Sequence, residues 1–281
     1  AFLSRFVDDG SLTIVFTFQV TMLAIIMLFP LFLRERAGEK LLPWTRGSSQ
    51  LKLNEQLADN TLKLFSFLKR AFSLRSTLLT ALVGLLIFIA GGVLSPITKV
   101  LFIQDLGWTR VELTDIEGGY GVFLGLFGAI AGGFLADKFG PKRIASIGCV
   151  LLAVCYATFG LSSPETGIVP WFDWNDKPVV VLYVLMSTWM EAMIAASMFA
   201  MCMTVSWPKV AATQFTAYMA ILNLSTVTGL KCSGWINDHM TLPTLFILVG
   251  AIQLVVIFIF PFIDVHQARR VLGHESTRNN D

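Results

Sequence analysis

Long apolar segments separated by short polar ones dominate this chain. Each segment holds about 20 residues or more with few charged side chains, which is the length that a helix needs to cross a hydrocarbon core roughly 30 Å thick. We find seven such segments, and they predict seven membrane-spanning helices and an all-α membrane protein. The predicted spans are Ser11 to Arg34, Leu78 to Leu101, Glu117 to Asp137, Ile144 to Leu161, Val179 to Ser206, Val210 to Gly234 and Leu242 to Ile263.

The composition excludes an ordinary soluble domain. Hydrophobic residues make up 55% of the chain, charged residues only 14%, and the mean hydropathy is +0.69. A soluble domain is less apolar and carries about 25% charged residues. The net charge of +2 is too small to indicate a nucleic-acid partner. The lipid bilayer is therefore the predicted environment.

Basic residues gather in one set of connecting segments, and this sets the predicted orientation. The opposite set carries mainly acids, among them Asp105, Glu112 and Asp173. Because Lys and Arg are retained on the cytoplasmic side of a membrane, we expect the basic set and the C-terminus to be cytoplasmic and Ala1 to be outside. The basic residues are Arg34, Arg36, Lys40, Arg46, Lys52, Lys63, Lys69, Arg70, Arg75, Lys138, Lys142, Arg143, Lys209, Arg269, Arg270 and Arg278.

The first two spans are joined by a connection that is long for a compact helical bundle. Its second half, Asn54 to Phe72, places apolar residues on one helical stripe and basic residues elsewhere. This pattern fits a helix lying in the membrane surface. A helix packed on the inner face of the bundle fits it equally well. The tail after Asp264 is polar, and we expect it to be disordered.

The most specific motif runs from Gly133 to Arg143, where a glycine-rich span ends in an acid, a turn and a basic pair. Small residues let a neighbouring helix approach closely in lipid. Gly140 supplies the turn, and Lys142 with Arg143 anchors the loop in the cytoplasm. The glycines of this span are Gly121, Gly125, Gly128, Gly132 and Gly133.

Asp137 lies at the C-terminal end of its helix, where the helix dipole disfavours an anion. It therefore needs a partner. We expect either the basic pair of the same loop or the N-terminus of the helix near Pro208, with Ser206 as its cap.

The pattern Gly-x-Leu-Ala-Asp-x-x-Gly-x-Lys-Arg resembles the loop signature of the major facilitator superfamily, which follows the second helix of its members and recurs more weakly after the eighth. The resemblance implies that the chain is the sixth helix, the central loop and the C-terminal six-helix bundle of a twelve-helix transporter. The first five helices, and with them an N-terminal bundle, would then be missing from this chain. It also implies that Gly133, Asp137, Gly140, Lys142 and Arg143 form a gating loop. The domains expected on this basis are 1–34 (last helix of the N-terminal bundle), 35–76 (cytoplasmic central loop with an amphipathic helix), 77–264 (six-helix bundle) and 265–281 (cytoplasmic polar tail).

A narrower resemblance is to the AmpG-like permeases, which carry peptidoglycan fragments in bacteria and belong to a clan that includes acetyl-CoA transporters. It rests on Ala211 to Met219, on Trp189-Met190-Glu191 and on Glu35 to Trp44. Asn223, Gly229 and Gly234-Trp235 also match. Where related sequences often have Gly-Arg, this chain has Ser225-Thr226, so a substrate contact by that arginine cannot be transferred. The resemblance implies a bacterial inner-membrane protein and a muropeptide-like or other amphiphilic substrate.

Glu191 is the best single candidate for function, because it lies near the centre of its span. An ionised carboxylate there costs several kcal/mol unless it is paired or faces water. Ser187 and Thr188 lie one turn earlier and make a polar patch with it. Glu191 is then either a cavity-facing group that binds a proton or part of the substrate, or a protonated acid that donates one structural hydrogen bond.

The next span carries Gln214 and Asn223, which either line the same cavity or donate hydrogen bonds between helices. In the second span Gly91, Gly92 and Pro96 predict a bend that would suit a gate, although packing alone would also explain them.

Motifs for other classes of protein are absent from the sequence. There is no phosphate-binding loop, no zinc-protease motif and no nucleophile elbow. The four cysteines lack metal-ligand spacing, and the three histidines lie in loops or in the tail, away from Glu191. We therefore predict no catalytic residue, metal or cofactor. The predicted function is secondary, proton-coupled transport of a small polar or amphiphilic solute. The alternative is a complete seven-helix receptor, although a retinal protein would need a lysine that Leu242 to Ile263 lacks.

Overall fold

The computed structural model describes residues 12–28, 65–169 and 172–278 of the chain. The chain divides into two units, residues 1–65 and 66–281. In the first unit the structure describes one apolar helix, α2 (Leu12–Leu28), which covers most of the first predicted span. The resemblance in Glu35 to Trp44 and most of the amphipathic segment lie outside the described residues.

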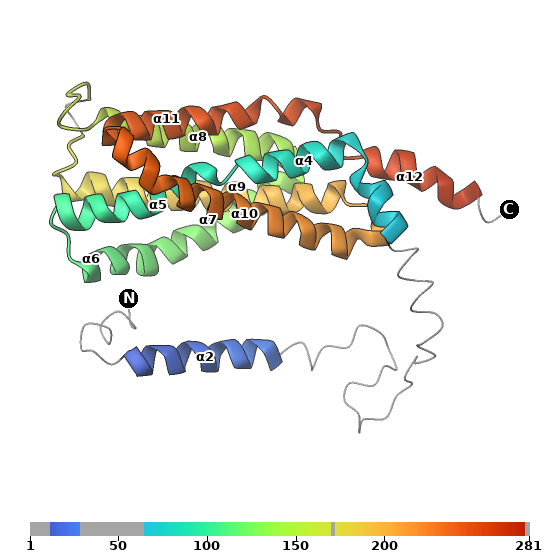
Figure 1. The fold of residues 1–281 in the computed structure, drawn as a ribbon, viewed down its shortest axis with the longest axis horizontal. Coiled ribbons are helices and arrows are strands. Elements are labelled where there is room, and N and C mark those ends of the chain that lie inside the picture. The colour runs from blue at the N-terminus through green and yellow to red at the C-terminus, as the bar shows by residue number, and fades with distance from the viewer. Residues whose placement is uncertain (1–11, 29–64, 170–171, 279–281) are drawn as a thin grey trace. The chain divides into compact units, whose positions relative to one another are not determined.

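The second unit is a bundle of helices (Figure 1). A helix over residues 65–72 leads into it. The bundle helices are α4 (Arg75–Leu86), α5 (Ile89–Val100), α6 (Arg110–Asp115), α7 (Gly121–Phe139), α8 (Pro141–Leu161), α9 (Lys177–Val205), α10 (Ala211–His239), α11 (Leu242–Ile257) and α12 (Gln267–Arg278). Two π-helical turns, η2 (Leu101–Asp105) and η3 (Ile116–Tyr120), and two 3-10 turns, η4 (Pro208–Val210) and η5 (Phe260–Phe262), connect them.

Five runs of helix in the described residues are long and apolar enough to cross a membrane. They correspond to the second, third, fourth, fifth and seventh predicted spans. The sixth predicted span is α10, which is long, at 29 residues, but less apolar than the others because it carries Gln214, Asn223 and several hydroxyl side chains. The five runs are Arg75–Asp105, Arg110–Phe139, Pro141–Leu161, Lys177–Val205 and Leu242–Leu272.

Glycines set the closest helix contacts. α7 packs along α9, and a Cβ atom on Gly128 would lie only 2.4 Å from the carbonyl oxygen of Trp189. α5 packs along α10 in the same way, because a Cβ atom on Gly92 would lie 2.4 Å from the carbonyl oxygen of Thr226. A Cβ atom on Gly133 would meet no atom within 4 Å. The predicted close approach therefore uses some glycines of the α7 span and not others.

The bend in the second span lies earlier than the sequence indicates. The helix breaks at Ile87 and Phe88, between α4 and α5, whereas Pro96 lies inside α5. The Phe88 amide donates to the hydroxyl of Ser225 on α10, at 3.0 Å, instead of to a carbonyl in its own helix. A side chain inserted into the helix ladder produces a kink. α5 runs unbroken through Gly91, Gly92 and Pro96, and the close approach of Gly92 to α10 matches the packing interpretation.

One end of the bundle is closed by a small second core. Ala71 of the helix over 65–72, Trp207, Val210, and Ala268 and Leu272 of α12 are buried together. The rings of Phe67 and Trp207 meet edge to face at 5.3 Å. The described part of the amphipathic segment thus packs on the bundle, as the second of the two interpretations proposed.

The tail is helical where we expected disorder. α12 is held because the Ser76 amide, in the first turn of α4, donates to the side-chain carbonyl of Gln267 at 2.8 Å. The Asp264 amide donates in return to the Ser76 hydroxyl at 3.0 Å. Two apolar side chains of α12 are buried, so the helix gains tertiary contacts that a polar composition does not reveal.

Candidate functional site: a polar cavity around Glu191

A cavity of about 260 Å³ lies among α5, η2, η3, α8 and α9. Its lining is polar for the interior of an apolar bundle, with two acids, one lysine, two tyrosines and several hydroxyls. The lining residues are Gly91, Leu94, Ser95, Thr98, Lys99, Phe102, Glu117, Tyr156, Tyr183, Val184, Ser187, Thr188 and Glu191. Of the sequence-predicted site residues, Glu191, Ser187 and Thr188 therefore come together here.

Glu191 is held by one hydrogen bond. The hydroxyl of Tyr156 on α8 donates to Oε1 of Glu191 on α9, at 2.8 Å. Gly91 on α5 leaves room for the carboxyl group, because a Cβ atom there would lie 3.2 Å from Oε1. In the described residues the carboxyl has no other hydrogen-bond partner. One of its two oxygens is therefore available to a proton, water or solute in the cavity.

Aromatic rings form the wall beside the acid. Tyr156 is 1% exposed, and its ring lies 6.4 Å from that of Tyr183. Tyr183 stacks on Phe159 with ring centroids 4.0 Å apart. This buried wall fixes the Tyr156 hydroxyl in front of Glu191.

The hydroxyls of Ser187 and Thr188 are oriented by their own helix. Both donate to the carbonyl of Val184, at 3.1 and 2.7 Å. Because each hydroxyl hydrogen is engaged, the lone pairs are left to accept hydrogen bonds. The patch one turn before Glu191 therefore favours donor groups of a solute.

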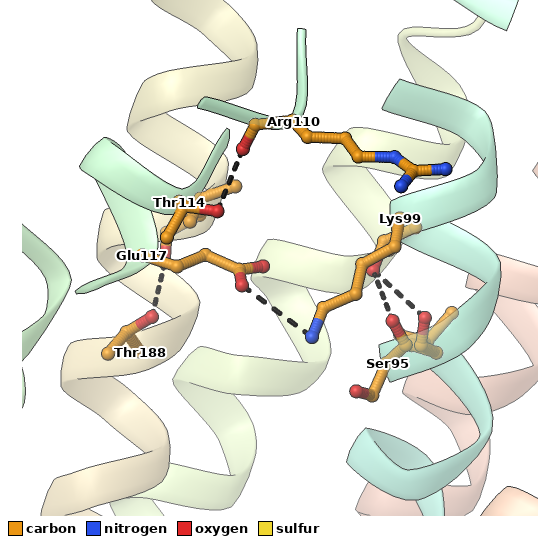
Figure 2. A network of polar contacts seen from close by, with 9 residues as sticks. Ser95, Lys99, Arg110, Thr114, Glu117 and Thr188 are labelled. Carbon is orange, nitrogen blue, oxygen red and sulfur yellow. Dashed lines mark hydrogen bonds and ion pairs between the residues drawn. The ribbon is translucent and has the colours of Figure 1, made fainter. Parts of the chain in front are cut away.

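Elsewhere in the cavity lining, Lys99 and Glu117 form an ion pair (Figure 2). Nζ of Lys99 on α5 is 3.6 Å from Oε2 of Glu117 in η3, and both side chains are partly exposed. Lys99 is the single cation in the lining that the structure describes. Glu117 belongs to the π-helical turn η3, and Lys99 lies two residues before the other one, η2. Such turns commonly occur at functional sites.

Sequence reasoning missed both members of this pair. A signal for Lys99 exists, because Gly91, Ser95 and Lys99 recur at a spacing of four residues and so share one helical face. Glu117 follows α6, whose start is fixed by polar contacts that a hydropathy profile does not reveal. Thr109 and Glu112 form a capping box at the start of α6, and Lys177 at the start of α9 pairs with Glu112 at 2.7 Å.

Gln214 lies outside the cavity lining. It is fully buried, its side-chain carbonyl accepts from the Trp207 amide at 2.9 Å, and its amide group donates to Thr77 and Tyr218, each at 3.3 Å. These contacts match the structural interpretation. Asn223 is exposed on α10 and has no hydrogen-bond partner in the part of the chain that the structure describes.

The predicted gating loop has a different set of contacts from the expected one. Gly140 adopts φ +93° between α7 and α8, as a glycine turn requires. Lys142 donates to the carbonyl of Ile263 at 2.6 Å, and Asp137 is exposed with no hydrogen bond or ion pair among the described residues.

The expected cap is absent as well. The Ser206 hydroxyl donates back to the Cys202 carbonyl at 2.7 Å, and α10 begins without a side-chain cap. In this conformation Asp137 therefore pairs with neither expected partner among the described residues: Lys142 binds the Ile263 carbonyl, and Ser206 binds within its own helix.

The comparisons with known proteins agree with the helical architecture. The profile described as Major Facilitator Superfamily matches residues 2–172 and 80–279, which together cover nearly the whole chain. No curated protein matches the chain. This multi-pass membrane protein, with its apolar helices and a polar cavity among them, belongs to the Major Facilitator Superfamily of transporters.

Proposed function

We propose that this chain carries the proton-coupling half of a secondary active transporter, with Glu191 as the group that binds and releases the proton. Family membership supports transport of a small molecule over the alternative of a seven-helix receptor. The observation that carries the proposal is the Glu191 carboxyl group, which holds one hydrogen bond from Tyr156 and opens into a polar cavity.

The hydrogen bond between Tyr156 and Glu191 suits a carboxyl group that cycles between two protonation states. The Tyr156 hydroxyl stabilises the ionised carboxylate as a hydrogen-bond donor. When Glu191 is protonated, Oε1 still accepts from Tyr156 while the second oxygen carries the proton into the cavity. Neither state leaves the tyrosine without its partner, so the switch requires no repacking of the wall.

The substrate that we propose is a small polar or amphiphilic metabolite of the muropeptide kind. Two features support this class. The sequence resembles the AmpG-like permeases in α9 and α10. The cavity also combines charges, Lys99 and Glu117, with hydroxyls and aromatic surface, which suits a solute that has both charged and apolar parts.

The same proposal places the chain in a bacterial inner membrane with its C-terminus in the cytoplasm. It also requires a partner bundle, because the cavity would form only half of a central pathway. The clustering of basic residues on one side and the resemblance to the C-terminal half of a twelve-helix permease support this placement.

The test is uptake by the intact transporter reconstituted in liposomes, with a radiolabelled muropeptide as the probe. Wild type and Glu191→Gln are compared in two assays: uptake driven by a pH gradient, and exchange of labelled for unlabelled solute without a gradient. Glutamine imitates the protonated acid, so we expect the variant to lose driven uptake and to keep exchange. Driven uptake at the wild-type rate would remove Glu191 from proton coupling. Absence of uptake and exchange in wild type would reject the substrate class.

A further inference from the structure

A second and larger cavity, of about 470 Å³, lies in the groove between α8 and α11. Its lining comes from the first turns of α8 and from the end of α11 with η5. We call it the basic groove. It is lined by Lys142, Arg143, Ser146, Ile147, Ile257, Phe260 and Pro261.

We propose that the basic groove binds the headgroup of an anionic phospholipid. The first argument is charge. The groove is lined by two cations and, in the described structure, by no acid. The ammonium of Lys142 uses one donor on the Ile263 carbonyl, which holds it in place and leaves two N–H groups. Arg143 has no hydrogen-bond or ion-pair partner within residues 65–169 and 172–278.

Nearby acids do not neutralise these cations. Asp264, which follows Ile263, is paired with Arg270 on α12. The Ser146 hydroxyl donates to the Lys142 carbonyl at 2.9 Å, so it offers no hydrogen to an anion. Lys142 and Arg143 are therefore the groups that would bind the anion. Two neighbouring cations can donate hydrogen bonds to the oxygens of one phosphate group.

The second argument is position. α8 begins at Pro141, and α11, the first part of the apolar run Leu242–Leu272, ends at Ile257. The groove therefore lies where both helices end, and we expect this to be the level of the lipid headgroups. The apolar surface beside it is exposed: Ile147 is 51% exposed and Phe262 is 62% exposed. Such a surface accommodates acyl chains while the phosphate meets the cations. Basic pockets between helices at the cytoplasmic side, the side predicted here, are known to hold anionic headgroups.

The experiment uses the intact protein in phosphatidylcholine nanodiscs to which phosphatidylglycerol is added. Bound lipid is counted by native mass spectrometry, and the unfolding temperature is recorded in parallel. Arg143→Gln is the main variant, because its loss breaks no hydrogen bond or ion pair within the described residues. We expect about fivefold weaker binding of phosphatidylglycerol for this one cation, and roughly 25-fold for Lys142→Gln with Arg143→Gln.

Two controls make the result specific. Lys138→Gln with Arg269→Gln removes the same charge from the same end of the bundle and should leave binding within twofold of wild type. Ile147→Trp fills the groove without changing charge and should weaken binding. If the Lys138 and Arg269 control lost as much phosphatidylglycerol binding, the effect would be a general attraction of the lipid to the basic surface. That result would overturn the proposal. Displacement of the lipid by millimolar inorganic phosphate would assign the groove to a soluble anion and overturn it too.

Discussion

Tyr156 on α8 and Glu191 on α9 are joined by a hydrogen bond of 2.8 Å inside the bundle, 35 residues apart in the sequence. The bond gives the carboxylate its single partner in the described structure. A neighbouring tyrosine, Tyr183, lines the same cavity and makes no such bond there. The two tyrosines therefore offer a matched pair for testing what the hydrogen bond does.

We expect Tyr156→Phe to slow proton-driven uptake by tenfold or more. A hydrogen bond to a charged group contributes about 1.5–3 kcal/mol. Its loss raises the free energy of the ionised Glu191 carboxylate, and this slows proton release. Tyr183→Phe removes a hydroxyl from the same wall and should change uptake by less than threefold. The measurement is the initial rate of uptake into liposomes at several pH values. If both variants slowed uptake equally, the aromatic wall, and not the Tyr156–Glu191 hydrogen bond, would determine the uptake rate.

Lys99→Gln should impair solute binding while leaving the stability of the bundle nearly unchanged. Partly exposed ion pairs contribute about 0–1 kcal/mol, so loss of the Lys99–Glu117 pair should move the unfolding temperature by only a few degrees. The cavity loses its single described cation, so we expect KM for an anionic solute to rise several-fold. The double variant Lys99→Glu with Glu117→Lys restores the pair with reversed charges. Recovery of normal KM in it would show that pairing, and not the position of the cation, governs binding.

The sequence predicted the spans because their signal is local. A run of apolar residues long enough to cross a bilayer is visible without knowing its neighbours, and Glu191 stands out because it interrupts such a run. Ser187 and Thr188 follow by helical spacing. The partner of Glu191 did not follow, since Tyr156 belongs to another helix and apolar runs carry no information on which helices touch.

The errors in prediction have the same origin. The sequence leaves open whether Gly91, Gly92 and Pro96 bend the second span or serve packing. The helix breaks instead at Ile87 and Phe88, where the Phe88 amide donates to the hydroxyl of Ser225, 137 residues away. Gly92 instead provides the close approach to α10. The polar composition of the tail predicts disorder, but Gln267 accepts a hydrogen bond from the Ser76 amide in the first turn of α4. In each case a contact between distant segments decided the local structure.

Gly128→Ala should destabilise the bundle, and Gly133→Ala should not. An added Cβ atom at Gly128 would lie 2.4 Å from the Trp189 carbonyl oxygen, so α7 and α9 must move apart. Overpacking of this kind costs about 1–3 kcal/mol. At Gly133 the added methyl meets open space, and alanine favours the helix by up to about 1 kcal/mol. Thermal unfolding in detergent measures both. Equal unfolding temperatures for the two variants would contradict the α7–α9 packing described here.

Asp137→Asn tests the gating loop. Asp137 has no partner in residues 65–169 and 172–278, so the substitution removes no described contact and should leave the unfolding temperature unchanged. The resemblance of this loop to the family signature implies a gating role for Asp137, and we expect its contact with a neighbouring helix to form in another access state. We therefore expect the variant to shift the balance between inward-open and outward-open states, read as labelling of single cysteines on the two sides of the membrane. Lys138→Gln, which alters the adjacent exposed charge, serves as the control. If labelling stays at wild-type levels for Asp137→Asn, the acid belongs to the structure of its loop only, beside Gly140, which shapes the α7–α8 turn.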